Sequence, residues 1–176
     1  KRSANICEDK RLADELLSSE KDHAENVMIV DLMRNDISRV CQPGTVNADE
    51  LCALKSFETV HHLVSKVTGE LKNNLNAIDI MKATFPPGSV TGAPKIRSME
   101  IISELEIQAR GPYCGSLGYI SFTGDMDTSV IIRTYFINQN KLFFSAGGAI
   151  VLDSNPEEEY QESLTKAQAL IKALTL

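Results

Sequence analysis

The sequence predicts an α+β fold, in which helices and antiparallel strands occur in separate blocks along the chain. Two observations lead to this prediction. Apolar residues at helical spacing dominate the first part of the chain, and three strand-like runs then follow one another between about residues 114 and 152. The polar connections GDMD and NQN between these runs are typical of β-hairpins, so we expect an antiparallel sheet packed with helices.

Each expected element has a local signal. A helical pattern covers residues 9–40, and Pro43–Gly44 marks a turn after it. Residues 60–71 are rich in β-formers, and Asn76 can cap a short helix that must end before the next prolines. The remaining predictions are a helix at 94–106, strands at 114–123, 128–137 and 141–152, and a capped helix at 157–174.

Composition excludes several classes of function. The chain has 176 residues, enough for one domain with a core, and its net charge of -6 argues against a nucleic-acid surface. No apolar run approaches the roughly 20 residues that span a bilayer, and no secretory signal is present. The four cysteines are scattered without a C-x-x-C pair, which predicts reduced thiols in a cytoplasmic protein.

The stretch FPPGSVTGAPKIRSMEII places backbone-permissive residues directly before a helical pattern. Pro94 suits the first turn of a helix, where its missing N–H removes no bond. The amides of Gly92 and Ala93 would then be free at the positive end of the helix dipole, with the charge of Lys95 nearby. The stretch is therefore either an anion-binding segment or a tight turn capped by Thr91.

Three glutamates are candidates for a metal site. Glu159 and Glu162 stand three positions apart in the final helix and are predicted to share a face. Acidic residues in a first turn usually complement the helix dipole, but two carboxylates on one face also suit Mg²⁺. Glu25 lies near the apolar side of the first helical stretch, where a metal ion is one partner that it could have.

Arg133 is the candidate for binding an anionic ligand. It stands in the apolar run VIIRTYF, and a buried arginine without a carboxylate partner can bind an anion through two hydrogen bonds. Tyr119 is expected on the neighbouring strand. Gly147 and Gly148 are expected inside a strand, where glycine often marks the close approach of a ligand. Together these features suit a small substrate with two carboxylates.

Two polar clusters have a structural interpretation beside the functional one. The charged residues of VDLMRNDISRV are either solvated or form a network that holds the helix, and we favour the network. His61 and His62 lie in a strand-like run, so their rings are expected on opposite faces and at most one belongs to a given site. A single histidine is more often structural, although its pKa makes it the usual acid–base candidate.

A set of motifs in order resembles the C-terminal part of the chorismate-utilising enzymes. The resemblance begins near Ser19 and rests on AENVMIVDLMRNDISRVC, VHHLVS, FPPGSVTGAPKIRSMEIISELE, GSLGYISFTGDMDTSVIIRT and AGGAIVLDSNPEEEYQE. The family includes anthranilate synthase component I, aminodeoxychorismate synthase component I, isochorismate synthase and salicylate synthase. PPGSVTGAPK, CGSLGYISF and SAGGAIV are most similar to the aminodeoxychorismate synthase branch.

The resemblance implies a role for each matching position. Glu25 and Glu162 correspond to Mg²⁺ ligands, and Glu159 to the metal shell or its water network. His62 corresponds to the active-site histidine near the ring hydroxyl of chorismate. The remaining matches are a clamp on the enolpyruvyl carboxylate, made by Tyr119 and Arg133, and a backbone lining of the pocket at Thr91, Gly92, Ala93, Gly147, Gly148 and Ala149.

The implied reaction replaces the 4-hydroxyl of chorismate with ammonia, which a glutamine amidotransferase partner supplies for the synthesis of p-aminobenzoate and folate. Two alternatives stay open. One is anthranilate formation, and the other is a chain that does not act as an enzyme by itself. Isochorismate or salicylate formation fits less well, because no base for activating water stands out in the sequence.

The sequence departs from the family pattern in two places. The chain begins about where the family's PIKGT motif, with its proposed nucleophilic lysine, should end, so we expect residues 1–176 to be the C-terminal portion of a chorismate-binding domain. Such a portion would expose an apolar face and strand edges that favour self-association. Ala149 stands where a third glycine is usual, and its methyl group is expected to crowd a carboxylate near that amide.

Overall fold

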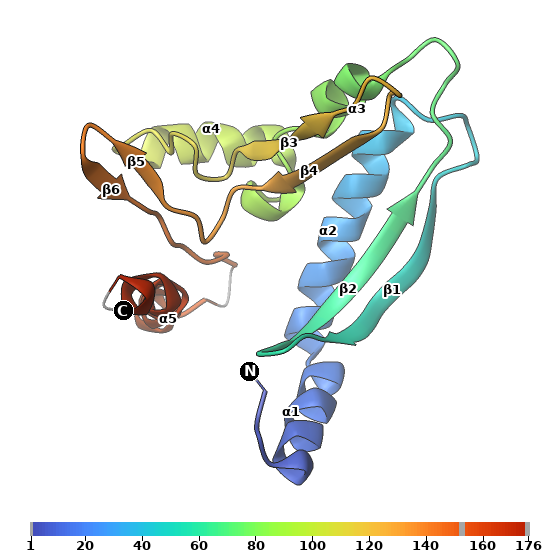
Figure 1. The fold of residues 1–176 in the computed structure, drawn as a ribbon. Helices are drawn as coiled ribbons and strands as arrows, with labels where there is room; N and C mark the ends of the chain where they lie inside the picture. Colours follow the sequence, from blue (N-terminus) through green and yellow to red (C-terminus); the bar gives the residue numbers. More distant parts are fainter. Residues whose placement is uncertain (1, 152–153, 175–176) are drawn as a thin grey trace. The chain divides into compact units, whose positions relative to one another are not determined.

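The computed structural model describes residues 2–151 and 154–174 and divides into two compact units, Lys1–Ile102 and Ser103–Leu176. It confirms the predicted α+β class: helices accompany strands that pair into separate two-stranded antiparallel sheets (Figure 1). None of the helices in the described ranges is both long and apolar enough to span a bilayer.

Unit 1 begins with two helices where the sequence predicted one helical stretch. They are α1 (Ile6–Ser18) and α2 (Glu20–Ser38), and they separate at Ser19. The Ser19 backbone is extended, and its hydroxyl accepts a hydrogen bond from the amide of Asp22 at 3.2 Å. Apolar spacing continues through this position, so only the capping residue marks the break.

A long hairpin, β1 (Asn47–Ser56) and β2 (His61–Thr68), packs along α2 (Figure 1). Strand β2 lies within the predicted run, whereas β1 was not predicted. The register of β1 shifts twice, between Ala48 and Glu50 and between Glu50 and Ala53, and Cys52 has a φ of 51°. These irregularities break the two-residue period that identifies a strand from sequence.

The core of unit 1 lies where the end of α2 meets α3 (Ala77–Thr84). The cap predicted at the start of α3 is confirmed. Asn76 and Asp79 form a capping box: the Asn76 side chain accepts from backbone amides of the first turn, and the Asp79 carboxylate accepts from the Asn76 amide. The core consists of three buried residues and five partly buried ones packed against them, namely Val40, Cys41 and Ala83, with Ile37, Val46, Leu71, Leu75 and Ile80.

The charged residues of VDLMRNDISRV form a network, as favoured from the sequence. Asp36 is only 2% exposed and accepts hydrogen bonds from Arg39 at 2.6 Å and from Lys95. Lys95 is the first residue of α4 (Lys95–Leu105), so this carboxylate links two helices that are far apart in the sequence. Asp31 binds Arg34 on the exposed side of the same helix.

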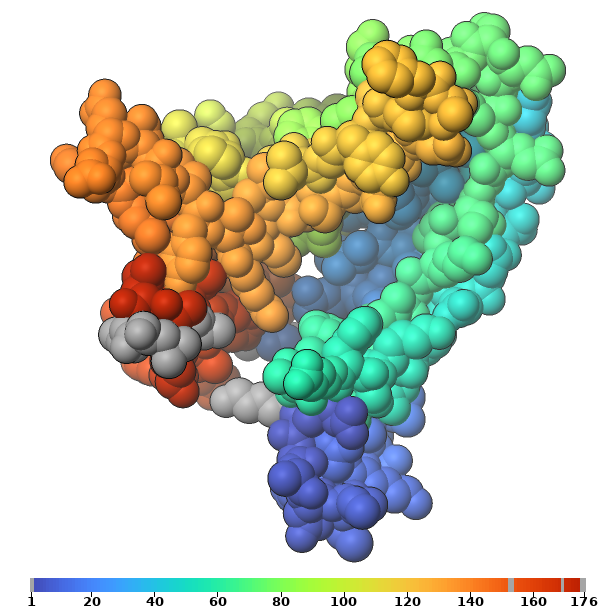
Figure 2. All heavy atoms as spheres, in the orientation of Figure 1, coloured from blue at the N-terminus to red at the C-terminus, as the bar shows by residue number. Residues whose placement is uncertain are grey.

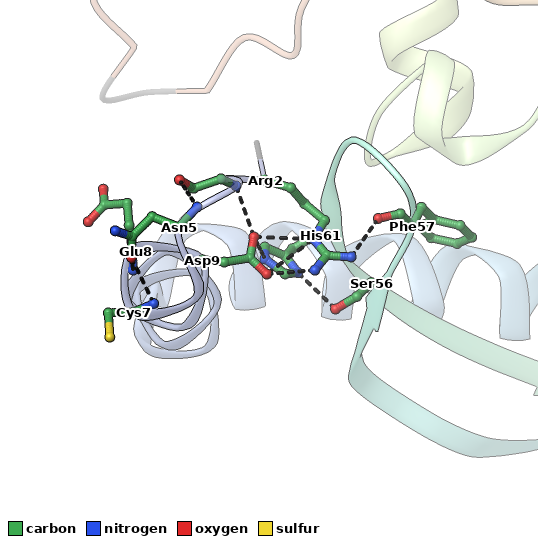
Figure 3. Close-up of polar contacts among 9 residues, drawn as sticks. Arg2, Asn5, Cys7, Glu8, Asp9, Ser56, Phe57 and His61 are labelled. Carbon is green, nitrogen blue, oxygen red and sulfur yellow. Dashed lines mark hydrogen bonds and ion pairs between the residues drawn. The ribbon is translucent and has the colours of Figure 1, made fainter.

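The start of the chain is held against the turn that connects β1 to β2 (Figures 2 and 3). Arg2 donates to the Asp9 carboxylate at 2.7–3.2 Å and to the Phe57 carbonyl at 3.1 Å. The ring of His61, whose side chain is 5% exposed, bridges Asp9 at 3.2 Å and the Ser56 hydroxyl at 2.8 Å. Because a carboxylate only accepts, the His61 Nε2 atom carries the proton.

Unit 2 contains two short hairpins and the last helix. The first hairpin pairs β3 (Ser116–Ile120) with β4 (Met126–Val130), the second pairs β5 (Phe136–Asn138) with β6 (Lys141–Phe143), and α5 spans Pro156–Ala173. The strand predicted over 128–137 is therefore interrupted, with Arg133 at a φ of 50°. The strand predicted over 141–152 ends at Phe143, and Leu152 lies outside the described residues.

Aromatic side chains pack on and beside the second hairpin, and one of them is hydrogen-bonded to α5. The rings of Phe136 and Phe143 stack across β5 and β6 with centroids 5.0 Å apart. The Tyr135 ring meets Phe144 edge-on at 5.8 Å, and its hydroxyl donates to the carbonyl of Leu170 in α5. In Figure 2, atoms of the orange segment touch atoms of the red helix.

The Asp9 cluster makes a prediction about the pH dependence of stability. The hydrogen bond from Arg2, aided by the Ser3 amide, lowers the pKa of Asp9 from its ordinary value of 3.8. A carboxyl group with a lowered pKa contributes stability above its ordinary pKa, and this contribution is lost as the pH falls through the folded-state value. We expect Asp9→Asn to be less stable than the wild type at pH 6, and this difference to shrink steadily as the pH is lowered from about 4 to 2, because the unfolded chain then binds a proton at Asp9 more readily than the folded chain does.

Urea denaturation across this pH range measures the difference. Asp14→Asn, at an exposed position of the same helix, is the control and should follow the wild type. A stability difference between wild type and Asp9→Asn that does not change with pH would contradict the prediction.

Candidate functional site

The N-terminal turn of α5 borders a cavity in unit 2 of about 350 Å³. One glutamate, two serines, one tyrosine and three small or apolar residues line it, namely Gly148, Ile150, Ser154, Pro156, Glu159, Tyr160 and Ser163. The sequence positions this wall through Asn155, whose side chain caps the helix by accepting from the amides of Glu157 and Glu158.

Glu159 is the buried charged group of this cavity, with 9% of its surface exposed. Its Oε1 atom accepts a hydrogen bond from the Ser154 hydroxyl at 2.6 Å, and Ser154 also accepts from the Val151 amide at 3.0 Å. Its Oε2 atom is buried and has no hydrogen-bond partner among the described residues. A buried carboxylate oxygen without a partner lowers stability, so such an atom indicates a place for a ligand.

Glu162 lies on the same face, as the three-residue spacing predicted. A Cβ atom placed on Gly148 would be 3.1 Å from Glu159 Oε2 and 3.7 Å from Glu162 Oε1, so both carboxylates face the same backbone segment. Glu162 is 46% exposed and forms an ion pair with Lys166 at 2.5 Å. The two carboxylates therefore differ: one is buried and half-satisfied, and the other is exposed and paired.

This donor set fits Mg²⁺. The ion commonly takes one or two carboxylates and completes its coordination with water and substrate oxygens, and Glu159 Oε2 is available for such a bond. Across the described ranges, no three His, Cys, Asp or Glu side chains within one unit form a metal-binding group. Glu25, the third predicted ligand, belongs to unit 1, so its part in the metal site stays a prediction.

In unit 1, Glu25 and His62 flank a polar network between α2 and β2. The Asn26 side chain donates to the carbonyl of Leu63 at 3.1 Å, and its oxygen accepts from the Ser65 hydroxyl. Asn26 directly follows Glu25, and Leu63 directly follows His62. One amide side chain therefore fixes the backbone beside both predicted site residues.

The two adjacent histidines differ as alternation requires. His61 is bound by Asp9 and Ser56, whereas His62 is exposed and its ring meets Phe57 edge-on at 5.9 Å. His61 is thus a structural residue, which leaves His62 as the histidine that can meet a ligand.

The segment before α4 corrects two expectations. The Gly92 amide donates to the carbonyl of Gly88 at 3.0 Å, so it is not the free anion-binding donor that was expected. Helix α4 starts at Lys95, and the Pro94 carbonyl accepts from the Ser98 amide, so Pro94 precedes the first turn instead of lying in it. The Thr91 hydroxyl donates back to the Pro87 carbonyl at 3.0 Å and closes a turn, which agrees with the alternative interpretation of this stretch as a tight turn capped by Thr91.

The predicted carboxylate clamp also differs from expectation. Tyr119 lies on β3, but Arg133 lies beyond the end of β4 and is exposed, so the expectation of a buried arginine on the neighbouring strand is wrong. Gly147 and Gly148 follow the end of β6 and are not inside a strand. The Tyr113 hydroxyl lies 3.3 Å from the Cβ position of Gly147, and burial raises the pKa of this tyrosine, which keeps it protonated.

Sequence reasoning missed two residues that the structure connects to the site. Ser154 appeared only as part of a helix cap, yet it binds Glu159. Asn26 gave no separate signal, because its hydrogen bonds join residues 37 and 39 positions apart. Its position directly after Glu25 was the one available clue.

Comparisons with known proteins agree on one family. A family model described as chorismate binding enzyme matches residues 1–172, which extends the resemblance upstream of Ser19. Aminodeoxychorismate synthase component 1 of Salmonella typhimurium is 55% identical over 166 residues, covering 94% of this chain and 37% of that protein. Anthranilate synthase component 1 of Aquifex aeolicus is 49% identical over 176 residues, covering 100% and 36%.

A solved structure supports the same relationship. Anthranilate synthase component I from Streptococcus pneumoniae superposes with a TM-score of 0.85 at 48% identity, covering 92% of this chain and 37% of that protein. The chain therefore spans little more than a third of the length of these relatives.

The half-satisfied carboxylate makes a prediction about metal and stability. Glu159→Gln keeps the side-chain shape and an oxygen that accepts from Ser154, but it removes the buried charge. We expect the variant to be more stable than the wild type by roughly 1 kcal/mol in EDTA, as urea denaturation would measure. Added Mg²⁺ should stabilise the wild type more than the variant.

Glu158→Gln, at an exposed carboxylate of the same helical turn, serves as the control. It should change neither the stability in EDTA nor the stabilisation by Mg²⁺. Equal stabilisation of wild type and Glu159→Gln by Mg²⁺, or a less stable Glu159→Gln in EDTA, would remove the basis for a metal site here.

Proposed function

We propose a function from one premise: this chain belongs to the chorismate binding enzyme family. The proposed activity is that of aminodeoxychorismate synthase component 1, in which ammonia displaces the 4-hydroxyl of chorismate. The C4–O bond breaks, a C4–N bond forms, and the hydroxyl leaves as water. The observation that supports this branch most directly is the 55% identity to the Salmonella typhimurium protein of that name over 94% of the chain.

The name component 1 also suggests a partner. We propose that a glutamine amidotransferase subunit delivers the ammonia, and that residues 1–176 correspond to the C-terminal portion of a chorismate-binding domain. The four cysteines are all free, which favours a reducing compartment such as the cytoplasm.

The proposed Mg²⁺ ligands are Glu159 and Glu162, with Glu25 added on the family resemblance. When bound, the ion would neutralise a substrate carboxylate and stabilise negative charge as the hydroxyl leaves. The chain's part is to present these carboxylates: Ser154 holds one oxygen of Glu159, so the other oxygen is directed to the cavity.

Other residues are proposed to bind and orient the substrate. Arg133 forms no ion pair with the described residues, so its guanidinium is available to the enolpyruvyl carboxylate, with Tyr119 as a second donor. His62 is proposed to hold or donate a proton at the ring hydroxyl. The backbone at Thr91–Ala93 and Gly147–Ala149 is proposed to line the pocket; the methyl group of Ala149 is its departure from the family pattern.

Anthranilate formation is the second candidate, and a specific observation favours it. The Aquifex aeolicus anthranilate synthase component 1 matches the whole chain at 49% identity, close to the value for the aminodeoxychorismate synthases.

Self-association through exposed apolar residues, such as Leu117 and Phe122 of unit 2, stays a prediction.

Product analysis of two chimeras separates the candidates. Residues 1–176 replace the homologous segment of the Salmonella typhimurium aminodeoxychorismate synthase component 1 in one, and of the Aquifex aeolicus anthranilate synthase component 1 in the other. Each receives chorismate, ammonia and Mg²⁺, and products are measured by liquid chromatography with mass spectrometry. We expect the first chimera to retain 4-amino-4-deoxychorismate formation and the second to lose about tenfold or more of its anthranilate formation, because substrate positioning is sensitive to pocket shape.

The two parent enzymes, with their own segments rejoined through the same junctions, are the matched controls. The reverse result, full anthranilate formation by the second chimera and none of the amino product by the first, would assign the chain to the anthranilate branch.

A further inference from the structure

The buried carboxylate of Asp36 binds two cationic side chains, and each of these also contacts another element of the fold. Its Oδ1 atom accepts from Arg39 Nη2 at 2.6 Å, and its Oδ2 atom accepts from Lys95 Nζ. Lys95 is itself 15% exposed at the side chain, so the Asp36–Lys95 pair is nearly dry. A buried ion pair is broken at high cost, because the remaining charge has no water to solvate it.

Each cation also binds a carbonyl at the end of α3. Arg39 Nη2 donates to the carbonyl of Ala83 at 2.8 Å, and Lys95 Nζ lies 3.4 Å from the carbonyl of Thr84. Thr84 ends α3 and Lys95 begins α4, so residues 85–94 connect the two helices. Both ends of this connection lie next to the Asp36 carboxylate and its two cations. Asp36 therefore fastens both ends of this ten-residue segment.

The segment itself is a compact turn on α2. The amides of Thr91 and Gly92 both donate to the Gly88 carbonyl, at 3.2 and 3.0 Å. Gly88 is so close to α2 that a Cβ atom there would lie 2.8 Å from Leu32 Cδ1. The segment is thus packed against α2 at Gly88 and held through Asp36 at its ends, while no hydrogen bond joins Asp36 to the described residues 91–93.

We infer that Asp36 is a positioning residue for chorismate binding. Acting through Lys95 and Arg39, it fixes the 85–94 segment and so sets where the backbone of Thr91–Ala93 meets the substrate. This inference rests on the proposed function for the identity of the substrate, but the holding of the segment does not depend on it. The charge is the essential property, because a neutral side chain of the same shape leaves Lys95 without a counter-charge.

Hydrogen exchange on the 176-residue chain tests the holding of the segment without any activity. In Asp36→Asn, the amides of Thr91 and Gly92 should exchange on the order of tenfold faster or more, while amides of the β1–β2 hairpin keep their wild-type rates. Asp31→Asn is the matched control, because Asp31 lies on the same helix in an exposed pair with Arg34 and should leave the segment unchanged. Unchanged exchange at Thr91 and Gly92 in Asp36→Asn would overturn the inference.

If Asp36→Asn does not fold, Lys95→Met replaces it, since Asp36 then keeps Arg39 as its partner. The same local increase in exchange is expected, and Lys95→Arg, which restores the charge, should reverse most of it. A Lys95→Met chain that folds with wild-type exchange in this segment contradicts the inference equally.

The link to the substrate is tested in whichever chimera turns over chorismate. Asp36→Asn should raise KM for chorismate on the order of tenfold with a smaller change in kcat, a split that a general loss of folded enzyme would not produce. Faster exchange with an unchanged KM would sink the substrate-positioning role. A chimera that makes anthranilate instead of the amino product would contradict the proposed function while leaving this test intact.

Discussion

The architecture of unit 1 depends on one buried carboxylate. Asp36 is almost completely removed from water, and burying a charged carboxylate lowers stability unless cations and hydrogen bonds compensate it. The cations are Arg39, from the end of its own helix, and Lys95, from the start of α4. Because both also reach carbonyls at the end of α3, one charge determines how three helix ends meet.

A second buried carboxylate, that of Glu159, has no cationic partner among the described residues. Asp36 has a cation on each oxygen, whereas Glu159 has a serine hydroxyl on one oxygen and no described partner on the other. In the first arrangement both oxygens have partners, whereas in the second one buried oxygen lacks a partner, which lowers stability but leaves a group that can bind a ligand. Among the proposed metal ligands, Glu159 is therefore the one whose surroundings best suit a ligand, whereas the family resemblance implied for it only a place in the metal shell or its water network.

Local signals predicted the elements that begin or end with side-chain chemistry. Asn76 predicted the start of α3, and the polar residues before Pro156 predicted the start of α5; Asp79, the second half of the α3 capping box, was found only in the structure. Periodicity failed where the backbone departs from a regular repeat. Strand β1 escaped prediction because two register shifts and the positive φ of Cys52 destroy its alternation. The strand expected through Arg133 was overextended because that residue also has a positive φ, which apolar composition does not reveal.

By itself, the sequence determined the fold class, the family and the residue types of the candidate site. Those depend on short-range spacing and on motifs that are read along the chain. The tertiary structure decided which members of each motif are available: His61 is bound by Asp9 while His62 is exposed, and the Gly92 amide is used within its own turn. It also decided that Lys95 binds Asp36 and not an external anion. These outcomes rest on contacts between residues up to 59 positions apart, whose partners no local pattern identifies.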